Sequence, residues 1–280
     1  LMPIKIAING FGRIGRPTFK RIIDNHPNLE LVAINDLTEP KTLAHLLQYD
    51  SIYGIYKRPI KFSEKALLVD GTKDGKRVQV FAETDPSKLP WKKLGIDIVL
   101  ECTGRFTDYE GAKKHLLAGA KKVIISAPSD DPGKVPSFVL GVNEEKFDSK
   151  KWDIVDMGSC TTNCLAPVAK VLNDNFGIIR GFMTTVHAYT ADQNLQDGPH
   201  QDLRRARAAT QNIVPTTTGA ATSCGEVIPD LKGIFDGLAI RVPVITGSLA
   251  DIVMVVKKKT TISEVNKILQ EACEIPQYKG

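Results

Sequence analysis

Residues 4–15, IKIAINGFGRIG, decide the fold of the first part of this chain. The apolar start of the stretch predicts a buried strand, and Gly10, Gly12 and Gly15 follow it at the spacing G-x-G-x-x-G. A helical pattern with Phe19 and Ile22 on one side begins directly afterwards. Three glycines between a strand and a helix are typical of a turn that binds the pyrophosphate of a dinucleotide.

Asp36 supports this interpretation, because it directly follows a second predicted strand, residues 29–35. A carboxylate in this place accepts hydrogen bonds from the adenosine ribose and repels a 2′-phosphate, so we expect NAD rather than NADP. The first glycine would permit a tight turn, the second a close approach of the pyrophosphate, and the third close packing of helix on strand. The alternative is a glycine-rich turn beside a solvated aspartate.

The remaining hydrophobic patterns predict two domains of different character. The first domain, residues 1–159, has strands alternating with helices and is expected to be an α/β Rossmann dinucleotide-binding domain. The second, residues 160–280, is expected to be an α+β catalytic domain with a mainly antiparallel sheet. In the first domain, further strands are predicted at 96–102, 122–126 and 138–142, a helix at 109–117, and short antiparallel strands within 57–80. In the second, helices are predicted at 161–174 and 262–272, and strands at 178–187, 237–244 and 249–256.

Composition excludes several classes of protein. The 280 residues are 42% hydrophobic, and no apolar run approaches the ~20 residues of a membrane span. Lys and Arg number 37 against 32 Asp and Glu, and they are interspersed, so a dedicated nucleic-acid site is not expected. Five cysteines without regular spacing argue against a disulfide framework and favour a cytoplasmic protein.

Cys160 is the candidate nucleophile. It lies in GSCTTNC, residues 158–164, where small polar residues precede an apolar helical run. A thiol at a helix N-terminus is stabilised as thiolate by unpaired N–H groups and the helix dipole. The alternative is an inert core cysteine, which is how we interpret Cys164 and the three other cysteines, Cys102, Cys224 and Cys273. No further ligand completes a metal set near Cys160 and Cys164, so no metal site is expected.

His187 ends an apolar strand-like run and is the candidate general base beside the thiolate. A structural role at the strand end is the alternative. The segment 189–212 is long and polar, and is either functional or disordered. Arginines and hydroxyls in and after it suit phosphate oxygens, although the Arg204–Arg207 run would also suit a solvated or interface surface.

These motifs together resemble phosphorylating glyceraldehyde-3-phosphate dehydrogenase across essentially the whole chain. The matching stretches include INGFGRIG (8–15), ECTGRF (101–106), SCTTNC (159–164), TTVHAYT (184–190), DLRRARAA (202–209) and PTTTGAA (215–221). The resemblance implies an NAD-dependent aldehyde dehydrogenase of glycolysis and gluconeogenesis. It would oxidise D-glyceraldehyde 3-phosphate to 1,3-bisphosphoglycerate with inorganic phosphate, through a thiohemiacetal and a thioester on Cys160.

The resemblance also implies a role for each matching residue and a homotetramer, in which segment 189–212 packs against a neighbouring subunit's cofactor. Cys160 would be the nucleophile and His187 its base. The cofactor would be bound by Gly10, Phe11, Gly12, Arg13, Ile14, Gly15, Asp36, Thr103, Gly104 and Ser126. The substrate's phosphate would be bound by Thr190, Asp192 and Arg241, and the attacking phosphate by Ser159, Thr161, Arg205, Thr218 and Gly219.

The chain departs from the family pattern at several places. Gly198 replaces a larger apolar residue, and residues 243–248 replace the family's usual run after Arg241. Thr84 stands where the family commonly has an arginine near the adenine, and the chain stops before the family's usual C-terminus, so we expect an incomplete catalytic domain. Two alternatives follow: an erythrose-4-phosphate dehydrogenase, in which water replaces phosphate, and a truncated, non-catalytic dinucleotide-binding protein.

Overall fold

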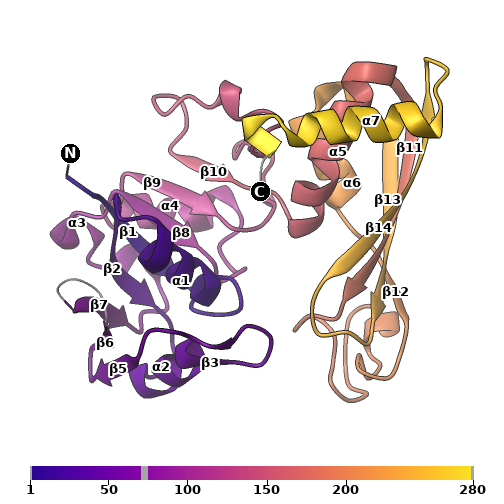
Figure 1. Ribbon diagram of the computed structural model, residues 1–280. Helices are drawn as coiled ribbons and strands as arrows, with labels where there is room; N and C mark the ends of the chain where they lie inside the picture. The colour runs from indigo at the N-terminus through magenta and orange to yellow at the C-terminus, as the bar shows by residue number, and fades with distance from the viewer. Residues whose placement is uncertain (1, 71–74, 279–280) are drawn as a thin grey trace. The chain divides into compact units, whose positions relative to one another are not determined.

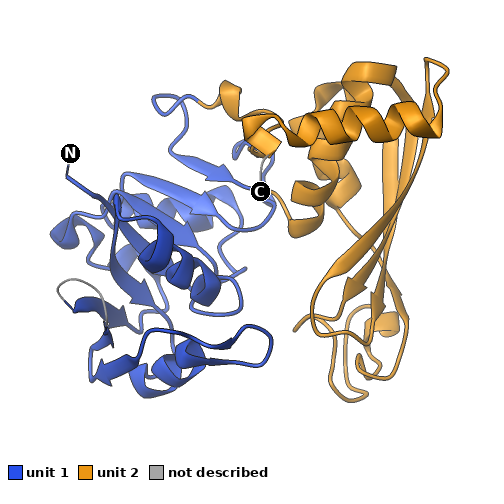
Figure 2. Cartoon of the chain, in the orientation of Figure 1, with its two compact units in different colours: residues 1–137, 148–157 blue, residues 138–147, 158–280 orange. Residues whose placement is uncertain are grey.

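The computed structural model describes residues 2–70 and 75–278, which form two compact units. Unit 1 comprises residues 1–137 and 148–157, and unit 2 comprises 138–147 and 158–280 (Figure 2). The division thus lies close to the boundary expected at residue 160. It differs in the segment 138–147, which belongs with the second unit. No helix of the described residues is long and apolar enough to cross a membrane.

Unit 1 is built on a sheet of eight strands in the order β10-β9-β8-β1-β2-β7-β6-β5 (Figure 1). The six strands from β10 to β7 are parallel, and β6 and β5 are antiparallel. The strands are β1 (Ile4–Asn9), β2 (Leu29–Asn35), β5 (Ile60–Ser63), β6 (Ala66–Val69), β7 (Lys76–Phe81), β8 (Ile98–Glu101), β9 (Lys122–Ile125) and β10 (Ile154–Asp156). A separate pair is formed by β3 (Tyr49–Asp50) and β4 (Gly54–Ile55), and the helices are α1 (Gly15–Asn25), α2 (Pro40–Gln48), α3 (Trp91–Leu94) and α4 (Tyr109–Leu117).

Helices cover both faces of this sheet, because successive side chains of β1 enter two different cores. Ile6 and Ile8 pack in a core with Phe19 of α1 and Leu43 of α2. Ala7, between them, points to the opposite face and joins the core of Trp91 in α3. A strand buried on both faces has a continuous apolar run, which explains IKIAI in the sequence. The Rossmann-type first half expected from the sequence is confirmed.

Unit 2 contains a mixed sheet in the order β12-β13-β11-β14, in which only the pairing of β11 with β13 is parallel. The sheet is thus mainly antiparallel, as expected. Its elements are α5 (Cys160–Phe176), β11 (Ile178–Ala188), β12 (Val214–Thr216), α6 (Ala220–Val227), β13 (Phe235–Val242), β14 (Ser248–Val256) and α7 (Ile262–Cys273). Short 3-10 turns lie at Glu144–Lys146, Leu203–Arg205, Pro229–Leu231 and Pro276–Tyr278 in unit 2, and at Pro86–Lys88 in unit 1.

Within the part of unit 2 that the structure describes, α5 and α6 cover one face of the sheet and the other face is exposed. Leu165 of α5 and Cys224 of α6 pack with Met183 of β11 in a single core. On β14 the residues alternate, so that Ile252 points to this core and Val253 points away and is exposed. The uncovered face therefore carries apolar side chains, including Phe182, Leu238, Leu249, Val253 and Val255.

Three expectations from the sequence were wrong. Residues 138–142 do not form a strand; Val139 and Val142 instead join the core of unit 2, which accounts for their apolar character. Cys164 and Cys273 are exposed rather than core residues. Within 57–80, β7 pairs in parallel with β2, so this segment is not purely antiparallel. Helices α2, α3 and α6 and the strand β10 were not anticipated.

Gly10 illustrates how tightly the turn after β1 is packed. Its φ of +91° is unfavourable for other residues, and an added Cβ would lie 2.7 Å from the backbone of Cys102 and of Thr103. Gly54 has a similar φ of +73° but open space around it.

We expect Gly10→Ala to lower the free energy of unfolding by about 2–4 kcal/mol, since strain and a backbone clash add together. Gly54→Ala should cost only about 1 kcal/mol, because strain acts alone there. Urea unfolding of both variants measures the difference, and equal losses would refute the packing argument.

Candidate active site

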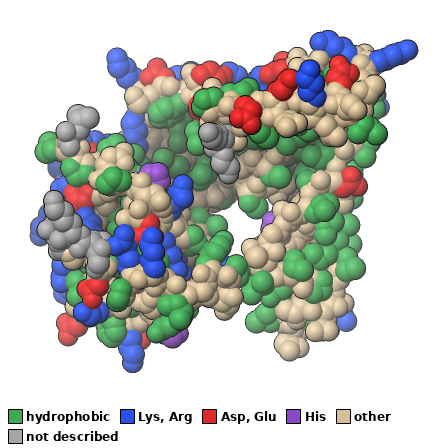
Figure 3. Space-filling model, viewed as in Figure 1, with side chains coloured by type: hydrophobic (Ala, Val, Ile, Leu, Met, Phe, Trp, Pro, Cys, Tyr) green, Lys and Arg blue, Asp and Glu red, His purple; other side chains and the backbone are tan. Residues whose placement is uncertain are grey.

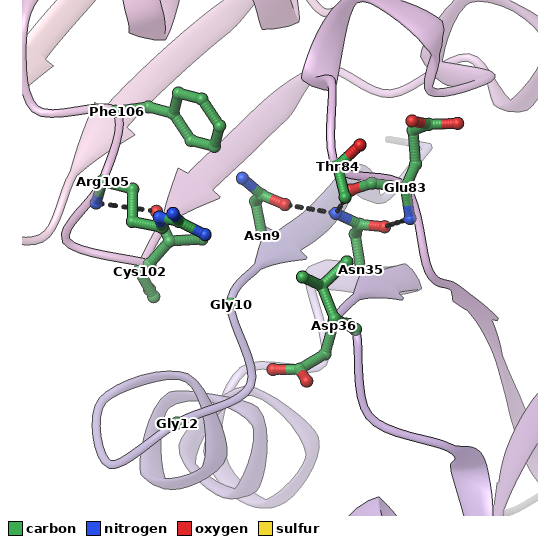
Figure 4. A pocket seen from close by; sticks show the side chains of 12 residues that line it. Asn9, Gly10, Gly12, Asn35, Asp36, Glu83, Thr84, Cys102, Arg105 and Phe106 are labelled. Carbon is green, nitrogen blue, oxygen red and sulfur yellow. Dashed lines mark hydrogen bonds between the residues drawn. The ribbon is translucent and has the colours of Figure 1, made fainter.

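Unit 1 has a groove of about 300 Å³ at the carboxyl ends of its parallel strands (Figure 4). This edge is where ligands bind in open α/β sheets. Residues that the sequence assigned to the cofactor line it, namely Gly10, Gly12, Asp36 and Thr103. Thr84, at the place of the family's arginine, also lines it. So do Asn9, Asn35, Leu37, Glu83, Cys102, Arg105 and Phe106, which the sequence analysis did not assign.

The three glycines have distinct surroundings. Gly10 makes the tight turn described above, and a Cβ on Gly15 would collide with the carbonyl oxygen of Gly10, so both are needed by the protein itself. A Cβ on Gly12 would meet nothing within 4 Å. The protein alone therefore does not require glycine at position 12. The open space there, in front of the N-terminus of α1, suits a bound pyrophosphate.

The carboxylate of Asp36 stabilises this turn through two hydrogen bonds. One carboxylate oxygen accepts a hydrogen bond from the Phe11 N–H at 2.8 Å, and the other accepts from the Thr38 N–H at 2.9 Å. Its remaining lone pairs face the groove and could accept ribose hydroxyls. The Arg13 guanidinium, in contrast, pairs with Asp50 at 2.5 Å. Ser126 follows β9, and its N–H donates a hydrogen bond to the carbonyl of Glu101, the last residue of β8, at 3.0 Å.

Unit 2 carries the thiol. Cys160 is the first residue of α5, and Ser159 caps the helix by accepting a hydrogen bond from the Thr162 N–H at 2.9 Å. The Cys160 sulfur lies 3.5 Å from Nε2 of His187, which is near the end of β11. The Thr161 hydroxyl lies 4.0 Å from the same sulfur. The structure thus brings the two expected catalytic side chains into contact.

The surroundings of His187 fix the orientation of its ring. Nδ1 lies 2.7 Å from the Ala188 carbonyl oxygen, which can only accept, and 2.6 Å from Arg241 Nη1, which can only donate. Arg241, the register partner of His187 on β13, also donates to the Ala188 carbonyl at 3.0 Å. With Nδ1 placed between these two groups, Nε2 is directed at the sulfur.

Hydrogen bonding to His187 is the main influence on the thiol. It lowers the pKa of Cys160 to about 7, against an opposing effect of burial. The same contact raises the pKa of His187, while burial and the charge of Arg241 oppose the rise. Burial raises the pKa of Cys102 to about 11 and that of Cys224 to about 12. Among these thiols, only Cys160 has a substantial thiolate fraction at neutral pH.

The two arginines predicted to bind phosphate have different neighbours in unit 2. Arg241 contacts His187, which in turn contacts Cys160. Arg205 pairs with Asp192 at 2.5 Å and donates to the Thr217 hydroxyl at 3.3 Å. The remaining predicted residues occupy turns and helix starts: Thr190 donates its N–H to Gln193, Thr218 accepts from the Ala220 N–H, and Gly219 precedes α6.

The long segment 189–212 is ordered by its own polar contacts. The Asn194 amide donates to the Gly198 carbonyl at 2.8 Å, and the Ala209 N–H donates to the Asn194 carbonyl at 2.8 Å. Arg204 and Arg205 both contact Asp202. Of the two possibilities left open by the sequence, disorder does not apply.

Replacing His187 by Asn removes the contact that lowers the pKa of Cys160. The pKa of the thiol then rises toward the ordinary value of about 8.5, so alkylation of Cys160 by iodoacetamide at pH 7 should slow roughly tenfold or more. With His187 present the rate should level off soon above pH 7, and without it the rate should continue to rise. Peptide mass spectrometry reports each thiol separately, with exposed Cys273 as the internal reference. An unchanged pH profile in His187→Asn would contradict the pairing.

Comparison with known proteins identifies the family of the chain. Residues 4–109 match the family domain described as glyceraldehyde 3-phosphate dehydrogenase, NAD binding domain, and residues 159–280 match the C-terminal domain of the same family. A glyceraldehyde-3-phosphate dehydrogenase of Clostridium acetobutylicum is 57% identical over 272 residues, covering 96% of this chain and 79% of that protein. One from Geobacillus stearothermophilus is 52% identical, covering 98% of this chain and 79% of that protein. One from Streptomyces coelicolor is 50% identical, covering 100% and 81%. The chain belongs to the glyceraldehyde 3-phosphate dehydrogenase family.

Proposed function

We propose that the chain oxidises D-glyceraldehyde 3-phosphate with NAD and inorganic phosphate to 1,3-bisphosphoglycerate. The observation that carries the proposal is the Cys160 sulfur 3.5 Å from His187 Nε2 at the start of α5. A thiolate of pKa about 7 is a nucleophile at neutral pH, and the aldehyde carbon is its target. The relatives above are all named for this dehydrogenase activity.

The first step forms a bond between the Cys160 sulfur and the aldehyde carbon, and the carbonyl electrons move to the oxygen. The protonated Nε2 of His187 stabilises this oxyanion and supplies its proton, giving a thiohemiacetal. Because Nδ1 lies between the Ala188 carbonyl and the Arg241 guanidinium, the ring keeps Nε2 directed at the reacting atoms.

The second stage oxidises the thiohemiacetal and releases the product. His187 Nε2 takes back the hydroxyl proton as hydride leaves the same carbon, and a thioester forms on Cys160. NAD, when bound, accepts that hydride. A phosphate oxygen then attacks the thioester carbon, the C–S bond breaks, and the acyl phosphate leaves while the thiolate is restored.

The groove of unit 1 fits the dinucleotide. The space at Gly12 and the N-terminus of α1 suit the pyrophosphate, and Asp36 suits the adenosine ribose. With Gly10 and Thr103 in the lining, Phe11, Arg13, Ile14, Gly15, Gly104 and Ser126 complete the proposed cofactor site, and Cys102 is an inert neighbour.

Two anion sites are proposed in unit 2. Thr190, Asp192 and Arg241 would bind the phosphate of the substrate, and Ser159, Thr161, Arg205, Thr218 and Gly219 the attacking phosphate. The support is chemical: Arg241 lies beside the imidazole of His187, and Arg205 lies beside the hydroxyl of Thr217 while pairing with Asp192 of the other proposed site. Guanidinium groups and hydroxyls are suitable donors for phosphate oxygens.

Mixing the purified chain with glyceraldehyde 3-phosphate, NAD and phosphate should produce reduced nicotinamide, measured by absorbance. Cys160→Ser should lower kcat by at least about a thousandfold, because a serine hydroxyl beside His187 is a far weaker nucleophile at neutral pH. Full activity in Cys160→Ser would refute the mechanism.

Two controls define the chemistry. Omitting phosphate should abolish the acyl phosphate product, whereas hydrolysis to the free acid would favour the erythrose-4-phosphate type of enzyme. NADP should support a much lower rate than NAD, because the Asp36 carboxylate repels a 2′-phosphate.

We also propose that the chain assembles as a homotetramer. Phe182, Leu238 and Val253 are exposed on one sheet face of unit 2, where Val253 is 66% exposed. Hydrophobic side chains gather over the strands of this unit in Figure 3. Asp236 and Asp251 lie on the same face, and an exposed face dominated by apolar side chains is typical of a protein interface. A second copy of the same chain presents an equally apolar face to it.

Sedimentation equilibrium should give a mass of several chains. Val253→Glu should shift the mass toward the single chain, since a charge at the interface centre is desolvated without a partner. Ile262→Glu, at an exposed apolar residue of α7 away from this sheet face, is the matched control, and equal masses for all three proteins would contradict this interface.

A reducing compartment, the cytoplasm, is the proposed location. Cys102, Cys160, Cys164, Cys224 and Cys273 are all free thiols. The catalytic role of Cys160 requires the free thiol, and cytosolic conditions keep thiols reduced. Fractionation of cells that express the chain tests this placement.

A further inference from the structure

A buried polar network lies beneath the cofactor groove of unit 1. Asn9, Asn35 and Glu101 are the last residues of β1, β2 and β8, and they are adjacent in register. All three are at most 5% exposed, and His115 behind them is fully buried. Figure 4 shows Asn9 between the Asn35–Glu83 side of the groove and the Cys102–Arg105 side. The network therefore connects the two walls.

The direction of each hydrogen bond is set at one end by Trp91. The indole Nε1 lies 3.0 Å from His115 Nδ1 and can only donate. Nδ1 of His115 must therefore accept, so the ring carries its hydrogen on Nε2. That Nε2–H lies 2.9 Å from Glu101 Oε2 and donates to it.

The direction at the other end is set by the backbone of Glu83. The Asn35 amide donates to the Glu83 carbonyl at 2.9 Å, and its oxygen accepts from the Glu83 N–H at 2.8 Å. The Asn35 nitrogen also donates to the Asn9 oxygen at 2.7 Å. The Asn9 nitrogen must then point the other way, and it donates to Glu101 Oε2 at 2.6 Å.

Thr103 occupies the second oxygen of Glu101. Its backbone N–H donates to Oε1 at 2.7 Å, and its hydroxyl contacts the same oxygen. The hydroxyl oxygen accepts from the Arg105 N–H at 3.0 Å, which leaves its hydrogen free for Glu101. Both oxygens of Glu101 thus face donors only, and these donors belong to Asn9, Thr103 and His115.

We infer that Glu101 is a positioning residue for the cofactor, because its carboxylate joins the two walls of the groove through donors that cannot be reversed. On one side it holds Thr103, and on the other it holds Asn9, which in turn holds Asn35 and Glu83. Asn9, Asn35, Glu83 and Thr103 line the groove, whereas Glu101, His115 and Trp91 do not. The inference rests on the proposed binding of NAD.

Glu101→Gln tests the inference because glutamine brings one acceptor and one donor to a place that needs two acceptors. In either orientation its NH2 group faces Asn9 and His115 or faces Thr103, so at least one buried donor loses its partner. We expect the dissociation constant for NAD to rise roughly tenfold or more, measured by calorimetric titration well below the melting temperature. Leu43→Ala, a buried change that does not line the groove, should lower the melting temperature and leave the dissociation constant unchanged.

His115 supplies a second, matched pair of variants that leave the groove lining and Glu101 intact. His115→Gln keeps an acceptor for Trp91 and a donor for Glu101, so NAD should bind within about threefold of the wild-type affinity. His115→Leu removes both, so NAD binding should weaken several-fold more than in His115→Gln. If Glu101→Gln does not fold, the difference in NAD affinity between His115→Gln and His115→Leu tests the inference instead.

The titrations separate this inference from the proposed function. Wild-type protein that does not bind NAD overturns both. Wild-type binding with unchanged affinity in Glu101→Gln and in His115→Leu overturns the positioning role alone. Equal weakening in Leu43→Ala would also overturn it, since general loss of stability would then explain the effect.

Discussion

The contact between the Cys160 sulfur and the His187 imidazole is the interaction on which the proposed mechanism depends. It joins the first residue of α5 to the end of β11, and both elements are held by one core that includes Leu165 and Met183. The value of the contact is positional, because a nucleophile and a base react only within hydrogen-bond reach. The core, the Ser159 cap and the Ala188 carbonyl keep these two side chains in that geometry.

The same constraint explains why chemically identical thiols differ. Cys102 packs against the core of unit 1 and Cys224 lies within the core of unit 2, and burial raises their pKa values to about 11 and about 12. Cys160 has an imidazole donor, and its pKa falls to about 7. The contact with Cys160 raises the pKa of His187, and the positive charge of Arg241 opposes this rise. Reactivity is therefore a property of the position in the fold, not of the residue type.

Much of the fold was predictable because it depends on short-range patterns. The bounds of β2 and α4 agree with the expected 29–35 and 109–117, and β1 occupies the apolar start of residues 4–15, since apolar runs and glycine spacing are local signals. The groove residues Asn9 and Asn35 were missed, although polar residues at the ends of apolar strands could have revealed them. Residues 138–142 were misassigned because an apolar run does not show which core it joins. Exposure of Cys164 was missed for the same reason.

The sequence by itself determined the family, the two-domain organisation, the cofactor class and the identity of Cys160 and His187 as candidates. These properties depend on residue types at set spacings along the chain. Only the tertiary structure decided that the sulfur meets Nε2, that Nδ1 is held by Ala188, and that Arg241 shares that carbonyl. It also decided that Trp91, His115 and Glu101 form one network beneath the groove. Donor direction and contact between distant residues arise only when strands and helices pack, because no local pattern encodes which groups they bring together.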